Sequence, residues 1–157
     1  MDFSLSSEQE MIRDSVNRFV EKNYSFNKYL ETVSTDSQMQ AKTWQQFAEF
    51  GWLGQPLPEA AGGYGGDAVD TSLITEGLGN GMVLEPFIAS VVFAGNLIAK
   101  AGNSDQHEAL IAPLVEGNKQ LAVAFAERIS RYNPAWCATT AKASDDGYVL
   151  AGEKHGV

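Results

Sequence analysis

Apolar side chains recur at helical spacing through the first three quarters of the chain. The first stripe consists of Ile12, Val16, Phe19 and Val20. Ser7 and Glu10 precede it with the spacing of a capping box, which predicts a helix beginning there. Similar stripes predict four more helices, which with their capping residues span about 41–50, 67–79, 86–102 and 104–117.

Three of these helices carry signals for their ends or their environment. Asp67 and Ser104 are predicted N-caps. Pro86 fits the first turn of the fourth helix, which is apolar on nearly every side and is therefore expected to be a central, buried helix. Pro113 lies inside the fifth helix and should kink it. Residues 23–38 are polar with scattered aromatics and predict a loop with a short helix.

The periodicity changes to two after the fifth helix. Leu121, Val123 and Phe125 alternate with alanines, which predicts a strand. Residues 136–143 read as extended, and Asp146-Gly147 is a hairpin-turn signal before a further strand at 148–150. The sequence thus predicts a mainly α protein with a helical domain, 1–118, followed by the first strands of a β-domain, 119–157. Three strands make a poor independent sheet, so we expect the chain to be part of a longer protein.

Composition removes several classes of function. The 157 residues carry a net charge of −9, which argues against a nucleic-acid or anionic-membrane binder. The single cysteine, Cys137, excludes a disulfide framework within the chain and fits a reducing cytoplasm. The start of the chain has no signal-peptide pattern, and its longest apolar run, 86–99, is too short to cross a bilayer.

Taken by themselves, the residues hold little that predicts chemistry. His107 and His155 are far apart and lack metal-ligand spacing, so no metal site is predicted. The acidic residues read as caps and turns, and no catalytic residue is predicted. Segment 56–66 contains four glycines and two prolines, but no strand precedes it, so it is not a phosphate-binding loop.

Several blocks, taken in order, resemble the acyl-CoA dehydrogenase family. They are Phe3-Ser4-Leu5-Ser6-Ser7-Glu8-Gln9, Gly51-Trp52-Leu53, Pro58-Glu59, Gly62-Gly63-Tyr64-Gly65-Gly66, Glu76-Gly77-Leu78-Gly79 and Ala101-Gly102-Asn103. The resemblance covers essentially the whole chain. It implies a helical N-terminal domain, a middle β-domain and a C-terminal helical domain, of which this chain resembles the first and the opening of the second.

The resemblance also implies an activity. Members of the family dehydrogenate acyl-CoA thioesters between the α and β carbons, with FAD as hydride acceptor and a glutamate of the C-terminal domain as base. The chain lacks the domain that supplies that base, so the fragment itself is expected to be inactive. Further implications are a place in fatty-acid and lipid metabolism and a homo- or hetero-oligomer with another acyl-CoA dehydrogenase subunit.

Site residues follow from matching positions. The family's fourth helix lines the acyl chain, which assigns Ala89 and Phe93 to substrate binding. The backbone amides of Phe125 and Ala126 correspond to the flavin-binding edge, although Ala126 replaces a threonine whose hydroxyl bonds the flavin ring. Arg131 lies, with Arg128, where the family follows the CoA path, and is assigned to a phosphate; the alternative is an ion pair with an acidic neighbour such as Glu127.

The departures from the family pattern favour a second hypothesis. The threonine position holds Ala126, Gly156 stands where the family has a tryptophan against the flavin, and 131–133 replace a short Gly-Ser-Asp turn. These changes resemble divergent members that pair with a more orthodox subunit. The alternative function is therefore a non-catalytic partner subunit that shapes the acyl pocket and the oligomer without binding its own flavin.

Overall fold

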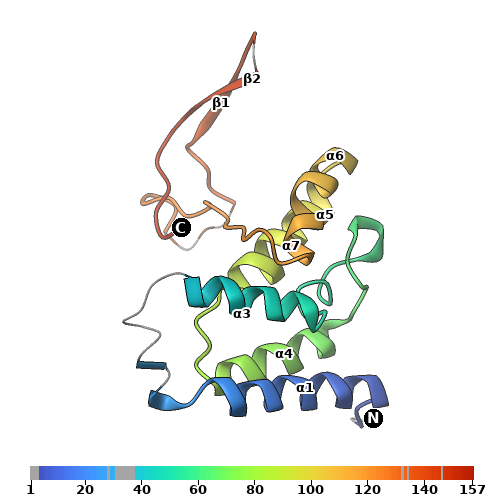
Figure 1. The fold of residues 1–157 in the computed structure, drawn as a ribbon. Coiled ribbons are helices and arrows are strands. Elements are labelled where there is room, and N and C mark those ends of the chain that lie inside the picture. Colours follow the sequence, from blue (N-terminus) through green and yellow to red (C-terminus); the bar gives the residue numbers. More distant parts are fainter. Residues whose placement is uncertain (1–3, 28, 31–37, 132, 134, 146) are drawn as a thin grey trace. The chain divides into compact units, whose positions relative to one another are not determined.

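Two compact units make up the chain, Met1–Leu121 and Ala122–Val157. The computed structural model describes residues 4–27, 29–30, 38–131, 133, 135–145 and 147–157. The first unit is helical and the second contains a β-hairpin (Figure 1). The predicted fold class, mainly α with the opening of a β-domain, is confirmed.

The helical unit contains the five helices that the sequence predicts. Its elements are α1 (Ser7–Asn23), α3 (Gln38–Glu49), η1 (Glu59–Ala61), α4 (Ala68–Asn80), η2 (Ile88–Gly95), α5 (Asn96–Ala101), α6 (Ser104–Gln106), η3 (His107–Ile111) and α7 (Ala112–Val115). The η2 and α5 elements are consecutive and form the fourth helix; α6, η3 and α7 form the fifth. Part of the loop predicted at 23–38 lies outside the described residues.

The capping box of α1 lies one residue earlier than predicted. Ser6 is the N-cap, and its hydroxyl accepts a hydrogen bond from the Gln9 amide at 3.2 Å. The Gln9 side chain accepts in return from the Ser6 amide at 3.1 Å. The prediction of Ser7 and Glu10 is wrong because Ser6 has the extended backbone of a cap (φ −67°, ψ 163°), whereas Ser7 is already helical.

Of the other two predicted N-caps, one is confirmed and one is wrong. Asp67 caps α4 as predicted, since its carboxylate accepts from the amides of Val69 and Asp70. At α6 the cap is Asn103, whose side-chain oxygen accepts from the Gln106 amide at 2.9 Å. Ser104 is therefore not the cap, because the extended residue at this helix start is Asn103 (φ −97°, ψ 177°).

The fourth and fifth helices each contain a π-helical stretch, η2 and η3, that the apolar periodicity did not predict. The η3 stretch ends two residues before Pro113, where a kink is predicted. In η2 the residues Ser90, Val91, Ala94 and Gly95 are buried. The opposite side of the fourth helix is open in this chain, since Ile88, Phe93 and Leu97 are 62%, 42% and 47% exposed. The prediction of a helix buried on every side is therefore wrong for this chain by itself.

One apolar core holds the helical unit together. Its buried members are Val16, Phe19, Trp44, Phe47, Trp52, Leu53, Leu57, Ile74, Leu78, Phe87, Val91, Ile111 and Leu114. Phe19 meets Phe47 and Trp52 edge to face, with ring centroids 5.5 and 5.4 Å apart. Helices α1 and α4 lie side by side (Figure 1) and approach closely at Gly77, where an added Cβ would stand 2.4 Å from a methyl carbon of Val16.

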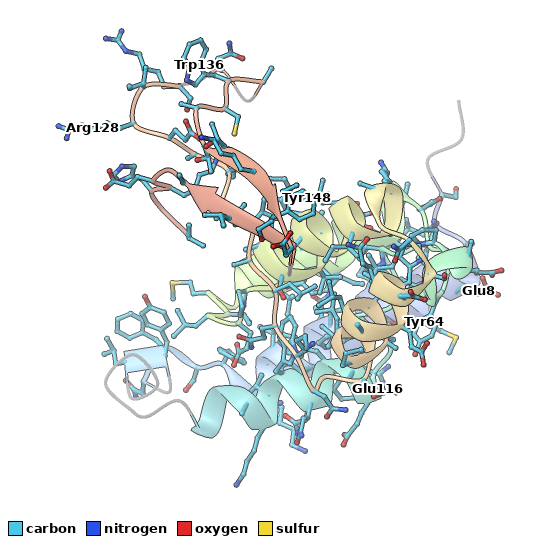
Figure 2. The ribbon with its side chains drawn as sticks, turned by 90° about the horizontal axis from the view of Figure 1, so that it is seen from above. Glu8, Tyr64, Glu116, Arg128, Trp136 and Tyr148 are labelled. Carbon is cyan, nitrogen blue, oxygen red and sulfur yellow. The ribbon has the colours of Figure 1, made fainter. Side chains whose placement is uncertain are left out.

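The glycine-rich segment after α3 is a hydrogen-bonded loop. The amides of Tyr64, Gly65 and Gly66 donate to the carbonyls of Gly54, Leu57 and Gln55. Gly63 has no room for a side chain, because an added Cβ would lie 2.2 Å from the Leu57 carbonyl oxygen. The ring of Tyr64, labelled in Figure 2, closes over Gly54 in the same way. This block of the family resemblance is therefore required by close backbone packing.

The second unit contains one antiparallel hairpin. Strand β1 (Thr140–Ser144) pairs with β2 (Gly147–Ala151), and Ser144 faces Gly147 across the ladder. The hairpin prediction is confirmed, although Asp146 lies outside the described residues. No strand forms at 121–125 or at 136–139, because the described chain supplies no neighbouring strand for their backbone groups. Every described residue of both strands is exposed.

Candidate functional site

The residues assigned to the acyl chain lie on the open side of η2. Ala89 is exposed and Phe93 is 42% exposed, whereas Ser90 and Val91 between them are buried. Ala89 also lines a pocket of about 310 Å³ between the end of α4 and the start of η2. An open apolar helix face is compatible with the wall of an acyl cavity, and the assignment of both residues stays a prediction.

A buried polar pair stands beside this pocket. The Tyr24 hydroxyl, just after α1, donates to Oε2 of Glu85 at 2.5 Å. Glu85 is 6% exposed and precedes the fourth helix. Burial, together with the neighbouring carboxylate, raises the pKa of Tyr24 well above its usual value. Sequence reasoning missed this pair because 61 positions separate its members; the only signal was an acidic residue beside an apolar run.

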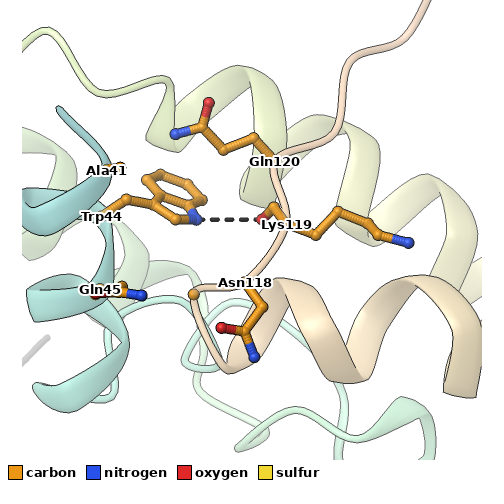
Figure 3. Close-up of a pocket in the computed structure, with 7 residues that line it drawn as sticks. Ala41, Trp44, Gln45, Asn118, Lys119 and Gln120 are labelled. Atoms are coloured by element: carbon orange, nitrogen blue, oxygen red, sulfur yellow. Dashed lines mark hydrogen bonds between the residues drawn. The ribbon is translucent and has the colours of Figure 1, made fainter. Parts of the chain in front are cut away.

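A larger open pocket borders α3. Its volume is about 440 Å³, and its lining includes Trp44, Gln45 and Lys119. Figure 3 shows the Trp44 indole donating to the Lys119 carbonyl, at 3.1 Å. The Lys119 ammonium is engaged with the Ala109 carbonyl at 2.9 Å. With these groups engaged in holding 117–120 against α3 and η3, the pocket offers little for chemistry.

The second unit is organised around Glu127. Its carboxylate accepts from the Lys154 ammonium at 2.8 Å and from the amides of Ala138 and Thr139 at 2.7 and 3.0 Å. The Thr139 hydroxyl donates to it at 2.7 Å and the Cys137 thiol at 3.4 Å.

These bonds, that of Lys154 first, hold the pKa of the Glu127 carboxyl well below its usual range. The same bond raises the pKa of Lys154. Sequence reasoning gave Glu127 no such role, since its partners lie 10 to 27 positions later. The carboxylate has a fixed positional role: it ties the turn at 127–131 to both flanks of the hairpin.

The predicted flavin edge is only partly free. The Phe125 amide donates to the Val123 carbonyl at 3.1 Å, so it is engaged locally. The Ala126 carbonyl accepts from the His155 amide at 2.9 Å, while among the described residues its own amide has no partner. Ala126 has no hydroxyl. The described part of this unit therefore offers one backbone donor at the position that the family resemblance assigns to the flavin, and not a complete flavin site.

Both arginines assigned to the CoA path are exposed. Figure 2 shows Arg128 extending away from the ribbon, and Arg131 adopts a left-handed backbone (φ 49°). Within the described part of the chain no ion pair joins Arg131 to Glu127, whose partner is Lys154. The ion-pair alternative therefore has no support at Glu127, and phosphate binding by Arg131 stays a prediction.

The described residues offer neither a metal site nor a membrane span. They contain no group of three or more histidine, cysteine or acidic side chains placed to hold a metal ion. None of their helices has the length and apolar character needed to traverse a bilayer.

The arrangement defines a class: a helical N-terminal domain joined to the opening of a β-domain. A family model described as "Acyl-CoA dehydrogenase, N-terminal domain" matches residues 6–118. The chain belongs to this family. The resemblance stated from the sequence is thereby confirmed.

Known proteins agree with the match. "Probable acyl-CoA dehydrogenase YngJ" of Bacillus subtilis is 28% identical over 156 residues, which cover 98% of this chain and 40% of that protein. An acyl-CoA dehydrogenase complexed with FAD from Bacillus anthracis is similar with TM-score 0.81 and 28% identity, over 96% of this chain and 26% of that one. The "Tcur3481-Tcur3483 steroid ACAD G363A variant" gives TM-score 0.80 and 27% identity, over 97% and 41%. The chain spans about 40% of the curated relatives it matches.

Proposed function

We propose that this chain is the N-terminal part of an FAD-dependent acyl-CoA dehydrogenase that removes hydrogen from the α and β carbons of an acyl-CoA thioester. The observation that carries the proposal is the family match over 6–118, which covers nearly all of the helical unit. Solved relatives with the same fold include an FAD complex. The proposed setting is cytoplasmic lipid metabolism.

Within that protein the chain has binding and positioning tasks. The open face of η2, with Ala89 and Phe93, forms a wall for the acyl group. The free amide of Ala126 donates to the flavin, which when bound accepts the hydride. Glu127 holds the backbone next to Ala126 in place through its bonds to Lys154 and to the far side of the turn. The base that takes the α-proton is assigned to the family's C-terminal domain, outside the part of the relatives that these 157 residues match.

The chain alone is therefore expected to be inactive and colourless. Loss of a general base costs about 10²–10⁴-fold in rate, and an incomplete flavin cleft costs more. An assay of the 157-residue chain with acyl-CoA and an artificial electron acceptor tests this. Turnover at an ordinary enzyme rate of about 10 per second, or one equivalent of flavin retained after dialysis, would contradict the proposal.

A specific observation favours a second candidate, a non-catalytic partner subunit in a hetero-oligomer. The flavin edge lacks the hydroxyl at Ala126, and the Phe125 amide is engaged with Val123. The steroid ACAD relative is itself named for two chains. Flavin content of the purified full-length assembly separates the candidates: one FAD per copy of this subunit supports the enzyme, and FAD held only by its partner supports the second role.

The acyl wall is tested by Phe93→Ala in the full-length protein. Shortening this side chain enlarges the cavity, so preference is expected to move toward bulkier acyl groups, seen as a change in relative kcat/KM across a series of acyl-CoA esters. Ser72→Ala, an exposed change on α4, serves as the control. An unchanged substrate profile together with lower stability would show that Phe93 has a packing role only.

Phosphate binding is tested by Arg131→Glu in the full-length complex. Loss of one charge-assisted hydrogen bond should weaken binding of the CoA ester by about 1–3 kcal/mol, measured by calorimetry at low and moderate salt. Lys142→Glu makes the same charge change at an exposed position of β1. Equal affinity of the Arg131 variant and the wild type at both salt levels would exclude the phosphate contact.

A further inference from the structure

A basic pocket lies between α1 and α3. Its volume is about 340 Å³, and its lining includes Arg18 and Lys22 of α1 together with Phe50, which follows α3. That volume is within the range of small-molecule sites, about 300–1,000 Å³. Among the described residues that line the pocket, none is acidic. On a chain of net charge −9, a pocket bounded by two cations without a carboxylate is a local site of positive potential.

Arg18 is held in place without an acidic partner. Its Nε atom donates to the Asp14 carbonyl at 3.0 Å, one helical turn earlier, which fixes the guanidinium along α1. The Asp14 carboxylate is itself bound by Arg13, at 3.2 Å. In the described part of the chain no ion pair involves Arg18, and its side chain is exposed. Its two terminal nitrogens are therefore accessible donors for an anion.

Aromatic rings form the apolar side of the same pocket. Phe19 is 5% exposed and meets Phe50 edge to face, with ring centroids 5.7 Å apart. Phe50 also stacks on Trp52 at 4.9 Å, so two contacts fix its ring. The Phe50 side chain is nevertheless 49% exposed. A planar ring placed against it would remove this apolar surface from water and gain ring–ring contact.

We propose that this pocket binds a small aromatic oxyanion, a planar ring that bears a phosphate or a carboxylate. The Arg18 guanidinium donates charge-assisted hydrogen bonds to the oxyanion, Lys22 one turn later adds a second positive charge, and the ring lies against Phe50. The inference goes beyond the proposed dehydrogenation, because the pocket contains none of the residues assigned to the acyl group, the flavin or CoA.

The first test measures binding of phenyl phosphate, phenol and inorganic phosphate to the 157-residue chain by NMR at low salt. Shifts of the Ser15 amide and of the Phe50 ring report on the pocket. Phenyl phosphate is expected to bind at least about tenfold more tightly than phenol, which lacks the charge, and than phosphate, which lacks the ring. Equal affinities for phenyl phosphate and phenol, or shifts confined to other parts of the chain, would overturn the proposal.

Three variants separate the contributions of charge and ring. Arg18→Gln should weaken phenyl phosphate binding by about tenfold and leave phenol binding unchanged. Lys100→Gln, the same loss of charge at an exposed position of α5 outside the lining, should leave both unchanged. Phe50→Leu should weaken both aromatic ligands and leave the affinity for inorganic phosphate as it is. Full phenyl phosphate affinity in Arg18→Gln, or equal losses in the Arg18 and Lys100 variants, would refute the site.

Discussion

The two units of this chain are stabilised by different physics. Residues 4–121 enclose an apolar core in which Phe47, Leu53 and Leu57 are fully buried. Residues 122–157 bury little apolar surface, and all described residues of their two strands are exposed. The second unit depends instead on the polar centre at Glu127. The first unit therefore has the means to fold independently, whereas the second is a hairpin that needs further strands for stability.

The largest expected difference in stability is between variants that each remove one aromatic side chain, one in each unit. Phe47→Ala removes a ring that contacts Phe19, Trp44 and Trp52 and should lower the free energy of unfolding by about 3–5 kcal/mol. Tyr148→Ala on β2, where the side chain is 74% exposed, should change it by less than about 0.5 kcal/mol. Urea denaturation followed by tryptophan fluorescence measures both. Similar losses in the two variants would mean that the units share one core.

A smaller effect tests close packing within the first unit. Gly77→Ala forces a methyl group against Val16 and should destabilise by about 1–3 kcal/mol. Gly79→Ala, two residues later on the same helix, meets open space and should stabilise by about 0.5–1 kcal/mol through helix propensity. Thermal unfolding of the pair is the measurement. A gain in stability from both substitutions would show that α1 and α4 do not pack as described.

The hydrogen bond between Tyr24 and Glu85 in the first unit should contribute somewhat less to the free energy of unfolding. Tyr24→Phe leaves both carboxylate oxygens of Glu85 without a donor among the described residues and should cost about 1–2 kcal/mol. The raised pKa of Tyr24 means that the fold favours the neutral phenol. This stabilisation is present below about pH 10 and is lost as pH rises beyond it. Absorbance titration should show one tyrosine fewer ionising near pH 11 in the wild type; ionisation of all tyrosines there would contradict the pairing.

The smallest effect on global stability is expected at the centre of the second unit. Glu127→Gln should leave urea unfolding of the helical unit unchanged, while amide exchange at Ala138 and Thr139 accelerates by roughly tenfold. Because the pKa of Glu127 is lowered in the fold, its contribution is present above about pH 4.3 and is lost as pH falls toward the folded value. Amide shifts of Ala138 that stay constant from pH 7 to well below 3, without exchange broadening, agree with the lowered pKa. A midpoint near 4.3 would exclude it.

The sequence by itself determined the features that depend on near neighbours in the chain. Five helices, the cap at Asp67 and the hairpin near Gly147 follow from periodicity and local hydrogen bonding. The two misplaced caps, at Ser6 and Asn103, lie one residue from their predicted places, because adjacent polar residues compete for the position and backbone angles select between them. The ordered family blocks also identified the family, since close packing in the glycine-rich loop constrains residue choice.

Only the tertiary structure decided the features that join distant parts of the chain. Tyr24 meets Glu85 across 61 positions, and Glu127 meets Lys154 across 27. Neither pair leaves a periodic pattern in the sequence, because a single polar contact depends on how the helices and turns that carry the two residues pack in the folded chain. The open side of the fourth helix is decided in the same way: its residues are apolar on every side, and only its packing, for example of Gly95 against Leu57 and Leu114, shows which side this chain buries.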